Sequence, residues 1–177
     1  MAGVMQRWKG RIAGVADSTF GAGKSGSSVK PAGALSVSVS AANSAATASA
    51  QTLKTYSIPA NTLDASGRGV EIRAFGTKAG NAAPVNLGLT VGGIAYTMGN
   101  DTQSGVSWLM SAVYYRSGAS AQTGEFDGSV GATAKAASVS TDTAVDTSAI
   151  VVNVTATDAS AASSNAVCNG LIVKMFN

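Results

Sequence analysis

Apolar and polar residues alternate along many short segments of this chain, and turn-forming residues separate those segments. Alternation with a period of two residues is typical of β-strands that bury one face. The pattern predicts strands at residues 34–40, 53–58, 69–77, 85–91, 94–98, 106–116, 120–127, 150–154 and 170–176. No long segment has convincing helical periodicity. Eight or nine short strands therefore predict an all-β fold, an antiparallel β-sandwich for which the jelly roll is the natural eight-strand version.

Two segments lack this alternation. Residues 41–51 contain no large apolar side chain, and we expect them to form an exposed loop. Residues 128–148 are polar and rich in alanine, which predicts a long loop with a weak strand near Val139.

The bulkiest segment of the chain, residues 106–116, predicts a strand buried on both faces, either inside the sandwich or at a subunit contact. As candidate subunit-interface residues we take Trp108, Met110, Tyr114 and Tyr115. The alternative, in which the two tyrosines are exposed and stack on a ligand, is less favoured than a place in the core or interface. Aromatic residues are only 6% of the chain, so the core has few large side chains. Such a core is often completed across a subunit interface.

The composition divides the chain into a basic, glycine-rich N-terminal arm at 1–33 and a β-sandwich domain at 34–177. Residues 1–30 hold five basic residues and one acidic residue, although the net charge of the chain is only +3. We expect the arm to dock on an acidic partner surface, with the candidate contact residues Arg7, Trp8, Lys9, Arg11 and Phe20. A solvated leader is the open alternative. Nucleic-acid binding is disfavoured because the basic residues are dispersed.

The apolar residues of the arm also leave its conformation open. Met5, Trp8, Ile12 and Val15 have the spacing of one helical face, but glycines at 10 and 14 argue against a helix that is stable alone.

Catalytic chemistry is poorly represented in the sequence. The chain has no histidine and a single cysteine, Cys168, which excludes a Ser-His-Asp triad, an internal disulfide and an ordinary zinc site. We expect no enzyme activity and no cofactor. No apolar run approaches the length of a membrane span, and no secretory signal is evident, so we expect synthesis in the cytoplasm and no membrane partner.

Residues 53–93 carry a resemblance to a known family. The matching elements are YSIPANTL at 56–63, Gly67, VEIRAFGT at 70–77, Asn81, LGL at 87–89 and the Gly92-Gly93 pair. They resemble a domain that recurs in bacteriophage virion proteins, including tail-fibre, head-fibre and capsid-decoration proteins. The resemblance implies a β-sandwich, commonly trimeric, on the outside of a virus particle, and it transfers no catalytic residue.

These observations together predict a non-enzymatic phage structural protein. We expect a homotrimeric capsid-decoration or head-fibre protein that is made in the host cytoplasm. In the virion, its arm is expected to attach it to the major capsid protein or to a tail component. The alternative is a tail-fibre or carbohydrate-binding module that contacts a host glycan.

Overall fold

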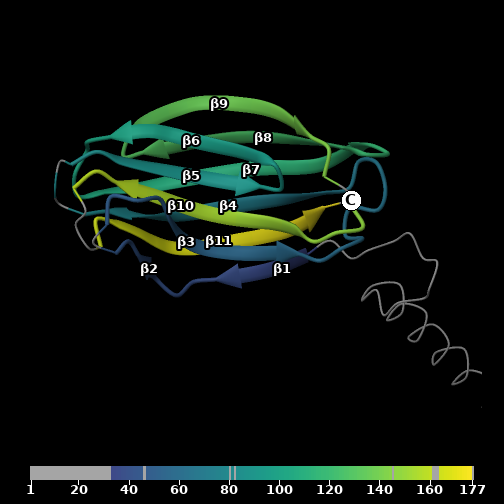
Figure 1. Cartoon of the computed structure of the whole chain (residues 1–177), viewed down its shortest axis with the longest axis horizontal. Coiled ribbons are helices and arrows are strands. Elements are labelled where there is room, and N and C mark those ends of the chain that lie inside the picture. Colours follow the sequence, from purple (N-terminus) through teal and green to yellow (C-terminus); the bar gives the residue numbers. More distant parts are fainter. Residues whose placement is uncertain are drawn as a thin grey trace, which may run out of the picture.

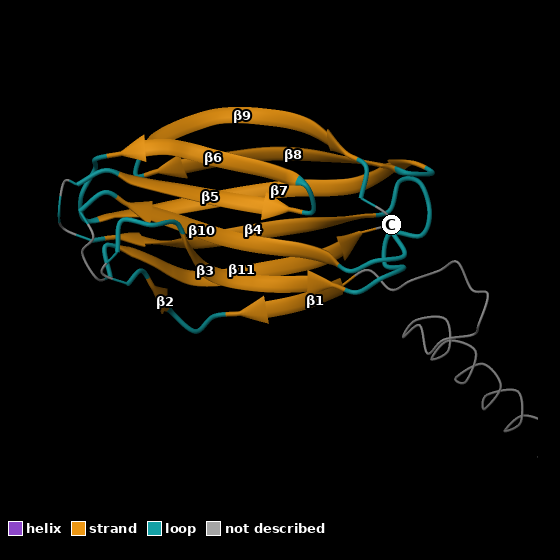
Figure 2. Ribbon diagram, in the orientation of Figure 1, coloured by secondary structure: helices purple, strands orange, loops and turns teal. Residues whose placement is uncertain are grey.

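The computed structural model describes residues 33–45, 47–79, 81, 83–144, 146–160 and 164–176. The predicted arm lies outside these residues, apart from Gly33. The described ranges contain eleven strands and no helix, as Figure 2 shows. The strands are β1 (Gly33–Ser38), β2 (Ala42–Asn43), β3 (Gln51–Ile58), β4 (Gly69–Lys78), β5 (Val85–Val91), β6 (Ile94–Asp101), β7 (Val106–Gly118), β8 (Ala121–Val130), β9 (Thr133–Asp142), β10 (Ile150–Asp158) and β11 (Ala166–Phe176).

Two antiparallel sheets pack face to face, which confirms the predicted β-sandwich (Figure 1). Sheet A has the strand order β1-β11-β4-β7-β8-β9, with the short β2 also paired to β11. Sheet B has the order β3-β10-β5-β6. Strands that are distant in the sequence, such as β4 and β11, are therefore neighbours in one sheet.

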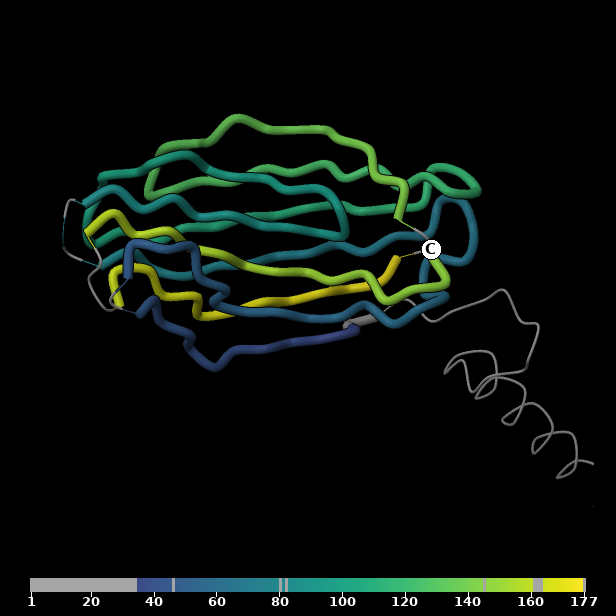
Figure 3. Tube along the Cα trace, viewed as in Figure 1, coloured from purple at the N-terminus to yellow at the C-terminus, as the bar shows by residue number. Residues whose placement is uncertain are grey.

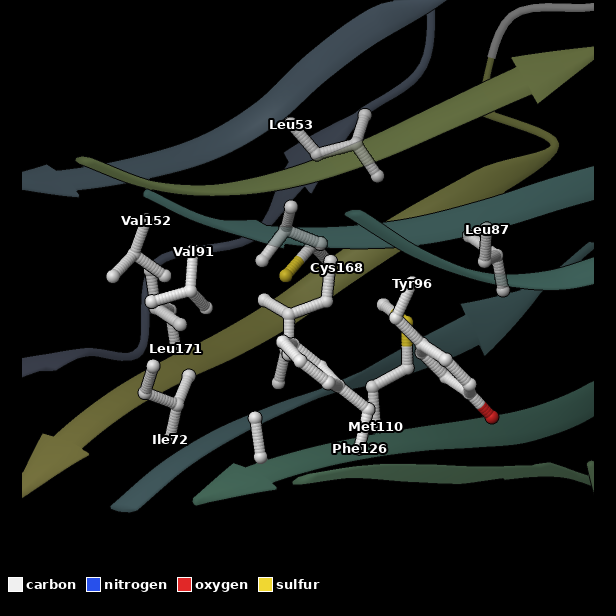
Figure 4. Close-up of a cluster of buried hydrophobic side chains, with 14 of the residues drawn as sticks. Leu53, Ile72, Leu87, Val91, Tyr96, Met110, Phe126, Val152, Cys168 and Leu171 are labelled. Carbon is white, nitrogen blue, oxygen red and sulfur yellow. The ribbon is translucent and has the colours of Figure 1, made fainter. Parts of the chain in front are cut away.

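The alternation in the sequence is what divides each strand between core and surface. In β4, Val70, Ile72 and Ala74 are fully buried, whereas Glu71 and Arg73 are exposed. Both sheets contribute such inward residues to a single hydrophobic core, part of which Figure 4 shows. Complete burial of one leucine or valine side chain stabilises a fold by about 1.5–3 kcal/mol, so this alternation drives the packing of the sheets.

Polar contacts connect the two sheets along both sides of the sandwich. On one side, Lys54 of β3 donates hydrogen bonds to the Ser38 hydroxyl, at 2.9 Å, and to the backbone oxygen of Ser40. On the other side, the Lys135 ammonium of β9 lies 2.6 Å from an Asp101 carboxylate oxygen of β6. These contacts explain how Lys54 and Asp101 can be almost fully buried.

The structure corrects the predictions for the weakly patterned segments. Residues 41–51, expected as a loop, include the two-residue strand β2. Most of the loop expected at 128–148 is instead the end of β8, a tight turn and the ten-residue strand β9. Figure 3 follows this part of the chain as a meander from β7 through β8 to β9. The weak strand expected near Val139 is confirmed as part of β9. Periodicity did not show its full length because β9 is an edge strand with mostly exposed side chains, held by backbone pairing to β8.

Candidate functional site

Three of the four predicted interface residues lie inside the sandwich. Trp108, Met110 and Tyr114 are 2%, 0% and 0% exposed, because these positions of β7 face sheet B. The prediction that they form a subunit contact is therefore wrong, since they already pack within their own chain. Tyr115 alternates to the opposite face and is half-buried on the outer side of sheet A.

The buried hydroxyl of Tyr114 is part of a polar contact at one end of the core. It donates a hydrogen bond to an Asp142 carboxylate oxygen at 3.1 Å, and the same oxygen accepts the backbone N–H of Gly93 at 2.7 Å. Burial and the negative charge of Asp142 raise the pKa of Tyr114 well above its ordinary value. The contact connects the end of β9 to the hairpin between β5 and β6, and its role is structural.

The five residues assigned to partner binding by the arm are Arg7, Trp8, Lys9, Arg11 and Phe20. They lie outside the described residues, so this assignment stays a prediction.

The outer face of sheet A carries an apolar patch formed by Val37, Phe75, Leu109 and Ile172. Register places Val37 beside Ile172 and Phe75 beside Leu109. Val37 is 57% exposed, and the other three side chains are half-buried. An antiparallel sheet that faces water usually presents polar residues there. A cluster of apolar side chains on such a face is typical of a contact surface.

An acidic groove of about 310 Å³ lies beside the apolar patch on the same face. The side chains that line it along β4, β7, β8 and β9 include Glu71, Ser111, Val113, Glu125, Asp127, Ala137 and Val139. Cross-strand pairing aligns Glu71, Val113, Glu125 and Val139 in one row. In the adjacent row, the Ser111 hydroxyl donates a hydrogen bond to Asp127. Every charged residue that lines the groove is a carboxylate.

The outer face of sheet B has a different character. Its outward positions on the four strands include Thr52, Thr55, Ser57, Asn86, Thr90, Ala95, Thr97, Val151, Asn153, Thr155 and Thr157, none of which is charged. The outward charges of the two sheets therefore belong to sheet A, where Arg73 and Lys174 accompany the three carboxylates of the groove.

The remaining reactive groups are built into the fold. Cys168 is fully buried, and burial raises the pKa of its thiol to about 11, so it is not a nucleophile at neutral pH. Burial also lowers the pKa of Lys78, although Asp101 and Asp158 oppose that shift, and its ammonium donates to the backbone oxygen of Asn81 at 2.9 Å. In the described ranges, no three His, Cys, Asp or Glu side chains come together as metal ligands.

The groove was not among the predicted sites, although the sequence contains a signal for it. Phe126 is apolar and lies between Glu125 and Asp127, so a strand at 120–127 with Phe126 inward places both carboxylates outward. The third carboxylate, Glu71, reaches the groove only because β4 and β8 both pair with β7.

Comparison with known proteins gives no relative for this chain. No family profile matches it, and no curated protein or solved structure matches it significantly. The resemblance at residues 53–93 thus stays a prediction from the residues. Among the residues that the structure describes, no helix is long and apolar enough to cross a membrane.

Proposed function

We propose that this protein is a non-enzymatic structural component of a bacteriophage virion. In this proposal, the β-sandwich associates with copies of itself as a homotrimer, and the N-terminal arm attaches it to a capsid or tail protein. The virion location and the trimer come from the resemblance at residues 53–93.

The observation that carries the assembly part of the proposal is the apolar patch on sheet A. Val37 and Ile172 form one outward apolar pair, and Phe75 and Leu109 form another, with Arg73 between the two pairs and the Phe75 ring also covering Gly170. Burial of apolar side chains at a subunit interface stabilises the complex by about 25 cal/mol per Å² of apolar surface removed from water. We therefore assign the subunit contact to this patch in place of the buried residues of β7.

The geometry favours binding over catalysis. The groove carboxylates lie on an open sheet face beside valines and one serine, and no histidine or reactive thiol accompanies them. General acid and base catalysis needs groups that are positioned and partly desolvated at a common centre. An open acidic groove is better suited to contact with a basic partner.

A second candidate function rests on the outer face of sheet B. Its rows of hydroxyl and amide side chains, such as Thr55, Asn153 and Thr90 in one row, offer hydrogen bonds to a neutral ligand without any charge. Host glycans have suitable chemistry. Binding above background on a glycan array that is lost in Asn153→Ala would support this candidate, and a blank array would eliminate it.

Deletion of residues 1–30 tests the virion attachment. We expect the truncated protein to keep the circular dichroism spectrum of a β-protein and to lose co-sedimentation with the phage particles to which the full chain binds. Unimpaired particle binding by the truncated protein would refute the role of the arm.

A further inference from the structure

We propose that the acidic groove on sheet A is the docking site for the chain's own basic arm. The segment that would occupy it contains Arg7, Lys9 and Arg11. The inference rests on the proposed function in taking residues 1–33 as a docking arm, and it gives this arm a second contact, on its own sandwich or on that of another copy, in addition to the proposed attachment to a capsid or tail protein. It does not require the chain to be a trimer.

Charge complementarity is the first argument. The groove presents Glu71, Glu125 and Asp127, and within the described ranges neither glutamate makes an ion pair. Several other carboxylates of the domain are already used internally, namely Asp101 with Lys135, Asp142 with Tyr114, and Asp146 with Arg116. Lys174 lies directly opposite Glu71 in the pairing of β11 with β4, and Arg73 lies in the row of Ser111 and Asp127, although neither basic residue lines the groove. Within the groove itself the charge is negative, and Glu125 and Asp127 have no basic cross-strand partner, so these two carboxylates are the part of the groove that best complements an arm with five basic residues and one acidic residue.

Spacing is the second argument. Glu125 and Asp127 are two residues apart on one face of β8, which separates their Cα atoms by about 7 Å. Basic residues at positions 7, 9 and 11 also follow at intervals of two, so an extended arm presents all three on one side at the same repeat. A helix would not, because residues two apart point to different sides of a helix.

The groove also offers apolar contact to the side chains that would enter it. Val113 and Val139 lie in the same row as Glu125, on either side of it. Val113 is 36% exposed and Val139 69% exposed, so both are accessible from solvent. Arginine and lysine bury their aliphatic stems along such surfaces while the charged ends reach carboxylates.

The arm is long enough to reach the groove from its own domain or from a neighbour. β1 begins at Gly33 at one edge of sheet A, and three strands lie between β1 and β8, which places them about 20 Å apart. The residues between Arg11 and Gly33 can span up to about 70 Å when extended. Docking within one chain and exchange between copies are both within reach, and the experiment below separates these two sources of the arm.

Zero-length cross-linking of the full-length protein tests the inference. A water-soluble carbodiimide joins a lysine Nζ to a carboxyl carbon as an amide and takes up the released water to become a urea. We expect mass spectrometry to find Lys9 linked to Glu125, Asp127 or Glu71. E125Q/D127N removes the reactive carboxyls at 125 and 127, so the informative link in this variant is Lys9 to Glu71, which should weaken because the groove has lost two of its three charges.

The matched control is T90R/T97R, which makes the same change in net charge on the outer face of sheet B without adding an amine. It should retain the Lys9 links. Cross-linking a mixture of isotopically light and heavy protein shows whether the arm comes from the same chain or another copy, and either result supports docking in the groove.

Absence of links from Lys9 to the three groove carboxylates would overturn the inference. A Lys9–Glu71 link of unchanged yield in E125Q/D127N would also overturn the inference, provided that circular dichroism shows both proteins to be folded. These outcomes can be told apart from failure of the proposed function. A protein that is monomeric and binds no phage particle can still show cross-links between Lys9 and the groove carboxylates of the same chain.

Discussion

A single methyl group at Gly76 is expected to destabilise the sandwich. Gly76 lies in β4 with its hydrogen toward the core, paired with Cys168 on one side and Trp108 on the other. A Cβ atom at this position would lie 2.6 Å and 2.7 Å from the Cζ2 and Cε2 atoms of Trp108. It would come closer still to the backbone oxygen of Val167.

The expected magnitude follows from which atoms are able to move. The Trp108 side chain is only 2% exposed, and the Val167 oxygen belongs to a strand that is paired with β4. Overpacking of a core typically costs about 1–3 kcal/mol, and a clash with backbone belongs at the upper end. The lower entropy of the unfolded alanine variant offsets about 0.5 kcal/mol. We therefore expect Gly76→Ala to lower the free energy of unfolding by about 2–3 kcal/mol.

Thermal and urea unfolding, followed by circular dichroism, measure this effect. For a domain of this size, a loss of about 2–3 kcal/mol corresponds to a decrease in Tm of roughly 5–10 °C. The matched control is Gly118→Ala, whose Cβ would find its nearest neighbour, the Ala121 Cβ, at an ordinary 3.6 Å. This control should stay within about 0.5 kcal/mol of the wild type. A Gly76→Ala protein as stable as the control would refute the close packing of β4 against β11 and Trp108.

Two further predictions concern buried titratable groups. Burial would raise the pKa of the Asp101 carboxyl, but hydrogen bonds from Lys135 and Gln103 outweigh burial and hold this pKa below its ordinary value of 3.8. The stability that Asp101 contributes is therefore complete above pH 3.8 and is lost as the pH falls through the lower folded-state pKa. Asp101→Asn should therefore make the free energy of unfolding in urea less dependent on pH on the acid side. An unchanged pH dependence would contradict this prediction. The Cys168 thiol is fully buried and has a pKa of about 11. It should therefore resist alkylation by iodoacetamide at neutral pH in the native protein and react after unfolding in urea. Rapid alkylation of the native protein would show that β11 opens readily.

The sequence predicts the sandwich well because period-two alternation is a local property of each strand. Val70, Ile72 and Ala74 show their inward face without reference to any other strand. Edge strand β9 is the opposite case. Its side chains are mostly exposed, so the information that makes it a strand lies in its backbone pairing with β8.

The candidate site shows the same limit. Bulk alone could not decide whether Trp108 and Tyr114 are covered by a second sheet or by a second subunit, because both environments select large side chains. The sequence places Glu125 and Asp127 on one face of a strand, but strand order is needed to bring Glu71 beside them. Likewise, no local pattern indicates that Gly76 must remain a glycine, since Val167 and Trp108 approach it from other strands.

The molar mass in solution tests whether the outer face of sheet A holds the subunits together. Light scattering on the full-length protein at micromolar concentration should give three times the chain mass of 17.4 kDa. V37R/I172R, which places two charges in the apolar patch, should give the mass of a single chain, while T90R/T97R on sheet B keeps the wild-type mass. A wild-type protein that is a stable monomer, or a folded V37R/I172R protein with unchanged mass, would contradict the account.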